Sequence, residues 1–441
     1  MPVRRLATLA LLLTLAGRGG AAQADPFTSS DLPLVLIETE GGAAIPDEPK
    51  VMARMRVVDN GPGARNALDD PPAYDGWVGI ERRGSSSQRF PKKQYAVETR
   101  HADGSNRNVA LLGLPDENDW VLYAPYSDKS LMRNALAYHL GRATGRYASR
   151  ARFCEVVLDG DYQGVYVLLE AIKDDGDRVD LADADSLGGG YLAKLDKRTG
   201  GGATWPSTDP VTGQFVRYQF DDPEADELTP AQRGEIEASF DAMEAATADA
   251  DADLSAHLDL DSWVDYVLVS EVTKNVDAYR ISTYFHRPGP GAPIHAGPLW
   301  DYNLAFGNAD YGAASDTKGF QYETPYTSET YPIPSWLSRV VAGEPFQARM
   351  RARWAELRAG PFATDSLLGW VDATAAQLDE AQARNFERWP ILDEDVWPNA
   401  HVGGSYAAEV EYLRSWLRER LAWLDGELLP APTTTPEASA E

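Results

Sequence analysis

Apolar and polar residues alternate along the first 170 residues, which is the pattern of half-buried strands. Residues 33–58 alternate in two runs that predict a β-hairpin, and residues 77–82 and 94–100 predict two strands around a Gly/Ser/Lys loop. A further hairpin is predicted around Asp159-Gly160-Asp161, because an Asp-Gly pair between two apolar runs favours a tight turn. The second strand of that hairpin ends near Glu170.

The spacing of apolar residues becomes helical in the rest of the chain. The acidic, Gly-rich stretch at 174–190 lacks the residue order of a calcium loop, so it is predicted to be a solvated connection. Apolar residues then recur at three- and four-residue intervals in 229–245, 261–273, 345–383 and 405–429. One helix is predicted earlier, beginning after Ser127 or Asp128, either of which can cap it.

This order of strands and helices predicts an α+β fold with two lobes. We expect a β-rich N-terminal lobe over residues 25–170 and a helix-rich C-terminal lobe over residues 171–429. Residues 1–24 combine basic residues, a short apolar run and an Ala-Gln-Ala cleavage pattern, which predicts a secretory signal peptide cleaved after about Ala24. An N-terminal membrane anchor is the alternative. The Pro/Thr-rich residues 430–441 predict a disordered tail.

Charge and cysteine content narrow the classes of partner. The formal net charge is −27, and a surface this acidic repels nucleic acids and anionic membranes, so we expect neither as a partner. No stretch after the predicted signal peptide is long and apolar enough to predict a transmembrane segment. The single cysteine, Cys154, lies in an apolar run and is predicted to be a small buried side chain. We expect a secreted, extracellular or cell-envelope protein that is a monomer.

Basic residues are concentrated in one short loop of this acidic chain. The stretch RRGSSSQRFPKK, residues 82–93, places a Gly/Ser loop between two predicted strands. Backbone N–H groups and Ser hydroxyls can donate to phosphate oxygens, and a lysine can neutralise them. Arg83, Ser85, Ser86, Lys92 and Lys93 are therefore candidates for binding a nucleotide. The stretch matches neither common phosphate-loop motif, and a solvated basic hairpin tip is the alternative.

Two aspartates lie where carboxylates can face a cleft. Asp277 follows a predicted helix and precedes a predicted strand, and Asp301 ends the strand-like run APIHAGPLW. Two carboxylates close together are unfavourable unless a divalent cation or a proton lies between them. Together with a phosphate loop, these residues suit phosphoryl transfer. The alternatives are a solvated acid after a helix for Asp277 and a turn cap for Asp301.

Other chemistries fit the sequence less well. The motifs G-x-S-x-G and H-E-x-x-H are absent from the sequence. His286 and His295 could be metal ligands but are more typical of ordinary strand and loop positions. Asp116 and Asp119 could suggest a glycosidase, although carboxylate pairs arise by chance in an acid-rich chain.

Seven segments together resemble the spore-coat protein H (CotH) kinase family, a secreted, atypical, protein-kinase-like group. The resemblance extends from about Val35 to Glu419. The segments are RRGSSSQRFPKKQYAVE, LLGLPDENDWVLYAPYSDKSLMRNALAYHLGR, GDYQGVYVLLEAIK, GGYLAKLDK, TKNVDAYRISTYFH, GPLWDYNLAFGNADY and ARNFERWPIL. The resemblance implies an atypical protein-kinase-like bilobal fold that binds ATP with Mg²⁺ or Mn²⁺ and phosphorylates protein Ser or Thr.

The resemblance also implies roles for individual residues. Asp277 would take the role of the catalytic aspartate, and Asp301 that of the metal-binding one. Lys92 or Lys93 would hold the nucleotide phosphates, with Lys92 preferred. Glu170 would lie near the hinge between the lobes and close to the nucleotide. Ordinary protein kinases have a metal-binding Asn five positions after the catalytic Asp. Ser282 occupies that position here, and Asn303 could compensate as a metal ligand.

Two other activities remain open on the same fold. A pseudokinase or surface adhesin would keep the fold and bind a partner without catalysis. An AMP transferase would use the same site to transfer a different part of ATP. The acidic surface favours a basic, Ser/Lys-rich protein substrate by charge complementarity.

Overall fold

The computed structural model describes residues 27–182, 188–198, 202–324, 326 and 330–429. The predicted signal peptide and the predicted disordered tail lie outside these ranges. None of the helices in the described ranges combines the length and the apolar character that a membrane span requires.

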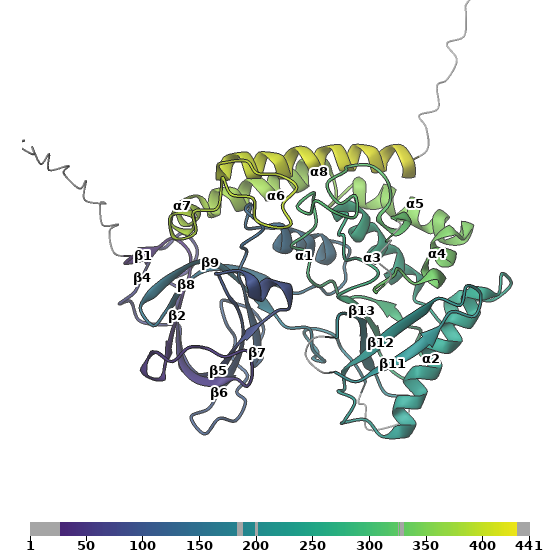
Figure 1. The fold of residues 1–441 in the computed structure, drawn as a ribbon, viewed down its shortest axis with the longest axis horizontal. Coiled ribbons are helices and arrows are strands. Elements are labelled where there is room, and N and C mark those ends of the chain that lie inside the picture. The colour runs from purple at the N-terminus through teal and green to yellow at the C-terminus, as the bar shows by residue number, and fades with distance from the viewer. Residues whose placement is uncertain (1–26, 183–187, 199–201, 325, 327–329, 430–441) are drawn as a thin grey trace, which may run out of the picture.

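The first half of the chain forms a closed β-barrel (Figure 1). In barrel order, the strands are β2 (Leu34–Thr39), β3 (Val51–Val58), β5 (Tyr74–Arg83), β6 (Gln94–Arg100), β7 (Asp119–Tyr123), β9 (Asp161–Glu170) and β8 (Ala151–Leu158). All neighbours are antiparallel except β2 and β8, whose parallel pairing closes the barrel. Short strands β1 (Ser29–Ser30) and β4 (Asn66–Ala67) pair with each other beside it.

The alternation in the sequence accounts for the barrel strands. In β5, Val78 and Ile80 are fully buried, and Ile80 lies opposite Val97 of β6, so one face of each strand fills the interior. The turn between β8 and β9 places Asp159 at φ 50° and Gly160 at φ 80°, as the Asp-Gly sequence predicts. Cys154 is buried in β8, and burial raises the pKa of its thiol to about 12, which confirms the expectation of an inert core side chain.

The second half contains a five-stranded sheet in addition to the helices that were expected there. The sheet order is β11 (Thr204–Thr208), β12 (Phe215–Asp222), β10 (Tyr191–Leu195), β13 (Thr283–Arg287) and β14 (His295–Ala296). Three of its strands fall between residues 191 and 222, directly after the predicted connection at 174–190, in a stretch for which no element was predicted. Trp205, Tyr218 and Phe220 bury the face of this sheet that α2 covers (Figure 1).

Eight helices are described, of which α1 belongs to the first half of the chain and the others to the second. They are α1 (Arg133–Ala143), α2 (Pro230–Ala248), α3 (Leu260–Thr273), α4 (Ser335–Ala342), α5 (Glu344–Arg358), α6 (Thr364–Gln377), α7 (Asp379–Arg388) and α8 (Tyr406–Leu428). Short 3₁₀ turns lie at Glu40–Gly42, Ser86–Arg89, Leu254–Ala256 and Gln321–Glu323. The central helix α3 begins at the cap Asp259, whose side chain accepts a hydrogen bond from the Ser262 backbone. The predicted mixed α+β fold is confirmed, with α8 lying along one side of the molecule (Figure 1).

Helix α7 joins the C-terminal half to the barrel. Its Asn385 accepts hydrogen bonds through Oδ1 from the Val165 backbone of β9 at 3.1 Å and from Lys92 Nζ at 2.8 Å. Gly164 has φ +94°, and a Cβ on it would lie 2.5 Å from Asn385 Oδ1. Glycine at this position therefore lets the helix approach the strand closely.

Candidate functional site

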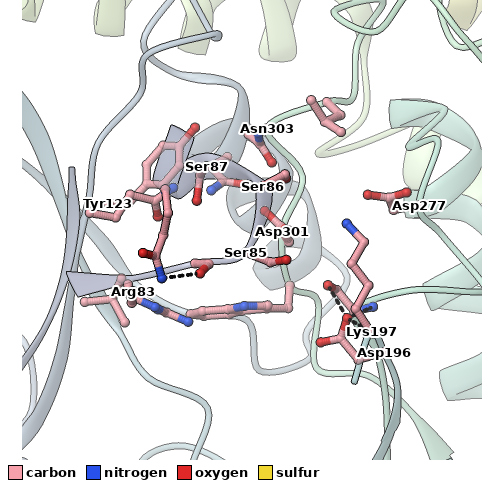
Figure 2. A pocket seen from close by; sticks show the side chains of 18 of the residues that line it. Arg83, Ser85, Ser86, Ser87, Tyr123, Asp196, Lys197, Asp277, Asp301 and Asn303 are labelled. Atoms are coloured by element: carbon pink, nitrogen blue, oxygen red, sulfur yellow. Dashed lines mark hydrogen bonds between the residues drawn. The ribbon is translucent and has the colours of Figure 1, made fainter. Parts of the chain in front are cut away.

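A cavity of about 670 Å³ lies between the end of barrel strand β5 and the C-terminal half. Its size is within the range of small-molecule sites. Figure 2 shows the labelled side chains of both halves around it. Seven of the predicted site residues line it: Arg83, Ser85, Ser86, Asp277, Ser282, Asp301 and Asn303.

The barrel side of the cavity is the Gly/Ser loop after β5. Gly84 has φ +97°, and a Cβ there would lie 2.1 Å from Ser87 Oγ, so the turn requires glycine. Ser85 and Ser86 follow it and line the cavity, as Figure 2 shows. The Arg83 guanidinium lies 5.3 Å from the ring centroid of Trp300, which belongs to the C-terminal half.

Helix α1 holds the backbone around Asp301. The Asp301 N–H donates to the Tyr138 hydroxyl at 3.2 Å, and the Tyr302 N–H donates to Asn134 Oδ1 at 2.7 Å. Trp300 stacks on Tyr138 with ring centroids 6.2 Å apart. Asp301 itself has φ 62°, a conformation that non-glycine residues adopt mostly at strained or functional sites.

The Asp301 carboxylate lies in an environment that disfavours its charge. Burial, followed by the negative charges of Asp277 and Asp196, raises the pKa of Asp301 to about 6. Lys197 and Arg83 oppose this shift only in part. Within the described residues no hydrogen-bond donor or ion-pair partner reaches the carboxylate oxygens of Asp301.

Asp277 is a second carboxylate in the same cavity, and it is buried. It is 4% exposed, and Arg280 Nη2 lies 3.3 Å from its Oδ1. The Asp277 N–H donates to Asn275 Oδ1 at 3.3 Å, which fixes the loop after α3. Burial raises the pKa of Asp277, with Lys197 and Arg280 acting in the opposite direction.

A buried ion pair holds the loop that contains Asp277. Glu271 of α3 and Arg420 of α8 are at most 1% exposed, and their side chains are 3.1 Å apart. Glu271 Oε1 also accepts from the Tyr279 hydroxyl at 2.8 Å, and its Oε2 accepts from the Gln321 N–H at 2.7 Å. Two helices and two loops therefore converge on one carboxylate.

Three charged residues at the end of β10 were not among the predicted site residues. Lys194, Asp196 and Lys197 all line the cavity. Lys194 forms an ion pair with Asp221, whereas Asp196 Oδ1 accepts from the N–H and Oγ of Ser282 at 3.4 Å. Their segment, GGYLAKLDK, contributed to the family resemblance. Three charged residues at the end of an apolar strand were the signal that could have identified them.

The structure places Lys92 away from the cavity, which corrects its predicted role. Lys92 is 1% exposed, and its Nζ donates to the Val165 carbonyl at 2.5 Å and to Asn385 Oδ1 at 2.8 Å. Burial lowers the pKa of this amine to about 7. Lys92 therefore links the barrel to α7 and does not line the cavity.

Lys93 and Glu170 also do not line the cavity. Lys93 Nζ donates to the carbonyls of Gln88 and Phe90 at 2.7 Å, so it supports the Gly/Ser loop from behind. Glu170 ends the barrel and is buried against Arg150 at 2.5 Å and Arg178 at 3.3 Å. The predicted nucleotide contacts of Lys93 and Glu170 are therefore not supported by their positions.

The other candidate sites lie elsewhere. His286 and His295 stack with ring centroids 4.9 Å apart in a separate cavity of about 280 Å³, and burial lowers the pKa of both. Asp119 forms an ion pair with Lys173. Across the described part of the chain, no three His, Cys, Asp or Glu side chains form a metal-binding group by themselves.

The residues of the main cavity nevertheless fit a nucleotide-bound Mg²⁺. Magnesium is usually held by one or two carboxylates together with phosphate oxygens and water, so it does not need three protein carboxylates. Asp301 provides a half-buried carboxylate with no cation partner among the described residues, and Asn303 provides an amide oxygen in the same cavity. Asp301 and Asn303 would hold the metal, and Ser282 is the remaining predicted ligand.

Comparison with known proteins gives a family but little structural detail. No curated protein matches the chain. A solved complex of HipA, HipB and operator DNA from Shewanella oneidensis MR-1 matches 79% of this chain and 63% of its own chain, at 13% identity and a TM-score of 0.26. The chain thus spans less than two thirds of that protein's length. The family model described as CotH kinase protein matches residues 80–424, which include the whole cavity apart from Asp47 and Glu48. The chain therefore belongs to the CotH kinase protein family.

Proposed function

We propose that the protein is a metal-dependent kinase that transfers the γ-phosphate of ATP to Ser or Thr of a protein substrate. The main support is the half-buried carboxylate of Asp301, which has no partner among the described residues and shares a cavity with Asp277 and a Gly/Ser loop. A divalent cation would relieve the repulsion among the carboxylates of that cavity. The barrel and the C-terminal half would then correspond to the two lobes of an atypical kinase.

Each residue of the cavity has a separate task in this proposal. Arg83, Ser85 and Ser86 bind phosphate oxygens from the barrel side. Asp301 and Asn303 hold a divalent cation, which when bound neutralises charge on the transferring phosphoryl group. Asp277 orients the acceptor hydroxyl and takes its proton as the oxygen–phosphorus bond forms and the bond to the leaving ADP oxygen breaks. The raised pKa of Asp277 suits it to accept that proton.

The net charge of the chain supports a proposal for the class of substrate, and the predicted signal peptide supports a proposal for the location of the protein. A chain with a net charge of −27 attracts basic proteins, so we propose a basic, Ser/Lys-rich substrate. We also propose that the protein acts outside the cytoplasm, as a secreted or cell-envelope protein.

Labelled ATP tests the proposed function. Purified protein is incubated with a generic basic protein, Mg²⁺ or Mn²⁺, and ATP labelled at either the γ- or the α-phosphate. We expect γ-label on the substrate from wild type and none from Asp277→Asn or Asp301→Asn. Asp261→Asn is the matched control, because Asp261 is 72% exposed on α3, outside the cavity, and its described ion pair is with Arg349.

Other outcomes identify the alternatives. Transfer of the α-label would show an AMP transferase. Binding of ATP without transfer of either label would show a pseudokinase, and transfer retained in both cavity variants would refute the assigned roles.

A further inference from the structure

With Lys92 and Lys93 away from the cavity, the proposed function has Arg83 as the basic side chain at the nucleotide phosphates, and a second cation would neutralise more of their charge. Four basic residues line the cavity: Arg82, Arg83, Lys194 and Lys197. Lys194 is already neutralised by Asp221 and lies over the ring of Tyr284. Lys197 differs from it, because no described acceptor or carboxylate is within hydrogen-bond or ion-pair distance of its ammonium group.

The backbone of Lys197 is nevertheless fixed. It follows β10, which lies between β12 and β13 in the sheet. Gln219 Nε2 donates to the carbonyls of Asp196 at 2.7 Å and of Lys197 at 3.3 Å, and the Lys197 N–H donates to Asp196 Oδ1 at 2.8 Å. A well-bonded backbone thus presents a side chain that has no partner among the described residues.

The charge of Lys197 acts on both candidate catalytic and metal-binding carboxylates. Among the opposite charges, Lys197 has the largest effect on Asp277 and on Asp301. Figure 2 shows Lys197 and Asp196 on the side of the cavity opposite Arg83, with Asp301 between them in this view. An anionic group that enters with a metal ion would therefore meet one cation from each half of the molecule.

We propose that Lys197 binds the terminal phosphates of the nucleotide and, with Arg83 on the barrel side, clamps the phosphate chain between the two halves. This inference rests on the proposed kinase function. It assigns the phosphate-binding lysine to the C-terminal sheet, whereas the sequence analysis expected it on the barrel.

Nucleotide affinity tests the inference without relying on turnover. Calorimetry measures binding of MgATP and of AMP to wild type, Lys197→Met, Lys197→Arg and Lys318→Met. We expect Lys197→Met to bind MgATP about tenfold more weakly, because it loses a charge-assisted contact, with AMP binding unchanged. Lys197→Arg keeps the charge and should recover part of the affinity. Lys318→Met is the charge-matched control, because Lys318 is exposed outside the cavity.

Chemical labelling of wild type gives a second readout that needs no variant to fold. Lysines are acetylated with a limiting reagent, and the modified peptides are quantified by mass spectrometry with and without nucleotide. We expect saturating MgATP to slow acetylation of Lys197 but not of Lys318, and AMP to protect neither.

The outcomes separate the two proposals. If wild type transfers γ-label while Lys197→Met binds MgATP as wild type does, or if MgATP leaves Lys197 unprotected, the phosphate clamp is refuted and the kinase proposal stands. If wild type neither binds MgATP nor transfers label, both proposals are refuted.

Discussion

Replacing Asp301 with Asn should stabilise the protein when no metal or nucleotide is bound, because the ionised carboxylate of Asp301 destabilises the folded state. Burial and the nearby acids raise the pKa of Asp301 from 3.8 to about 6. A carboxyl group with a raised pKa binds its proton more tightly in the folded chain, so the free energy of unfolding falls as pH rises from about 4 to about 6. One pKa unit is about 1.4 kcal/mol, which gives about 3 kcal/mol for the full shift.

The effect expected in solution is smaller than this upper value. The Asp301 side chain is partly exposed to the cavity, so water relieves some of the cost and we expect about 1–2 kcal/mol. Asn has nearly the same shape and never carries the charge. Asp301→Asn should therefore match wild type near pH 4 and exceed its stability above about pH 6.

Urea denaturation at a series of pH values measures this difference, in buffer without divalent cations or nucleotide. Asp261→Asn serves as the control, because its carboxylate is 72% exposed and its removal should change stability little. Equal stability of wild type and Asp301→Asn at pH 7 would refute the reasoning, as would a less stable variant. Either result would mean that the carboxylate is well satisfied in the free protein.

Three further changes test other parts of the structure. Because the pKa of Lys92 is lowered in the folded chain, the unfolded chain binds more protons between about pH 7 and pH 9, and the free energy of unfolding of wild type should rise by about 1–2 kcal/mol over that range. Lys92→Met should lack this rise. Urea denaturation checks this, and weaker MgATP binding would contradict the placement of Lys92 away from the cavity. Gly84→Ala should weaken MgATP binding about tenfold by calorimetry, because the loop needs φ +97°; unchanged binding would show that the loop does not hold phosphate. Arg420→Met should lower the free energy of unfolding by about 3–5 kcal/mol, because it leaves Glu271 buried without its partner. Urea denaturation measures this change, and a loss below about 1 kcal/mol would show that the other hydrogen-bond donors satisfy Glu271.

The sequence predicted those parts of the site that local pattern determines. The Gly/Ser loop and the two aspartates each follow a strand or helix whose apolar spacing is clear, so their approximate positions could be inferred. The closed barrel could not be inferred, because its closure depends on the parallel pairing of β2 with β8 across more than a hundred residues.

The orientation of Lys92 also depends on a distant contact. Its hydrogen bond to Asn385 joins residues that are 293 positions apart, and no local pattern indicates that an amine will be buried there. The position of Lys197 at the cavity also depends on distant contacts, because β10, the strand that it follows, pairs with β12 and β13 in a sheet that was not predicted.

The arrangement of strands has a consequence for aggregation. The barrel is closed, so its described strands leave no long edge to which another chain could add. In the C-terminal sheet, edge strand β14 is only two residues long, and edge strand β11 carries the exposed Pro206 at its centre. Proline has no N–H to donate to a neighbouring strand, so it interrupts addition at that edge. Both sheets are therefore poor templates for intermolecular strand pairing, which would help a strand-rich chain remain unassociated at high concentration.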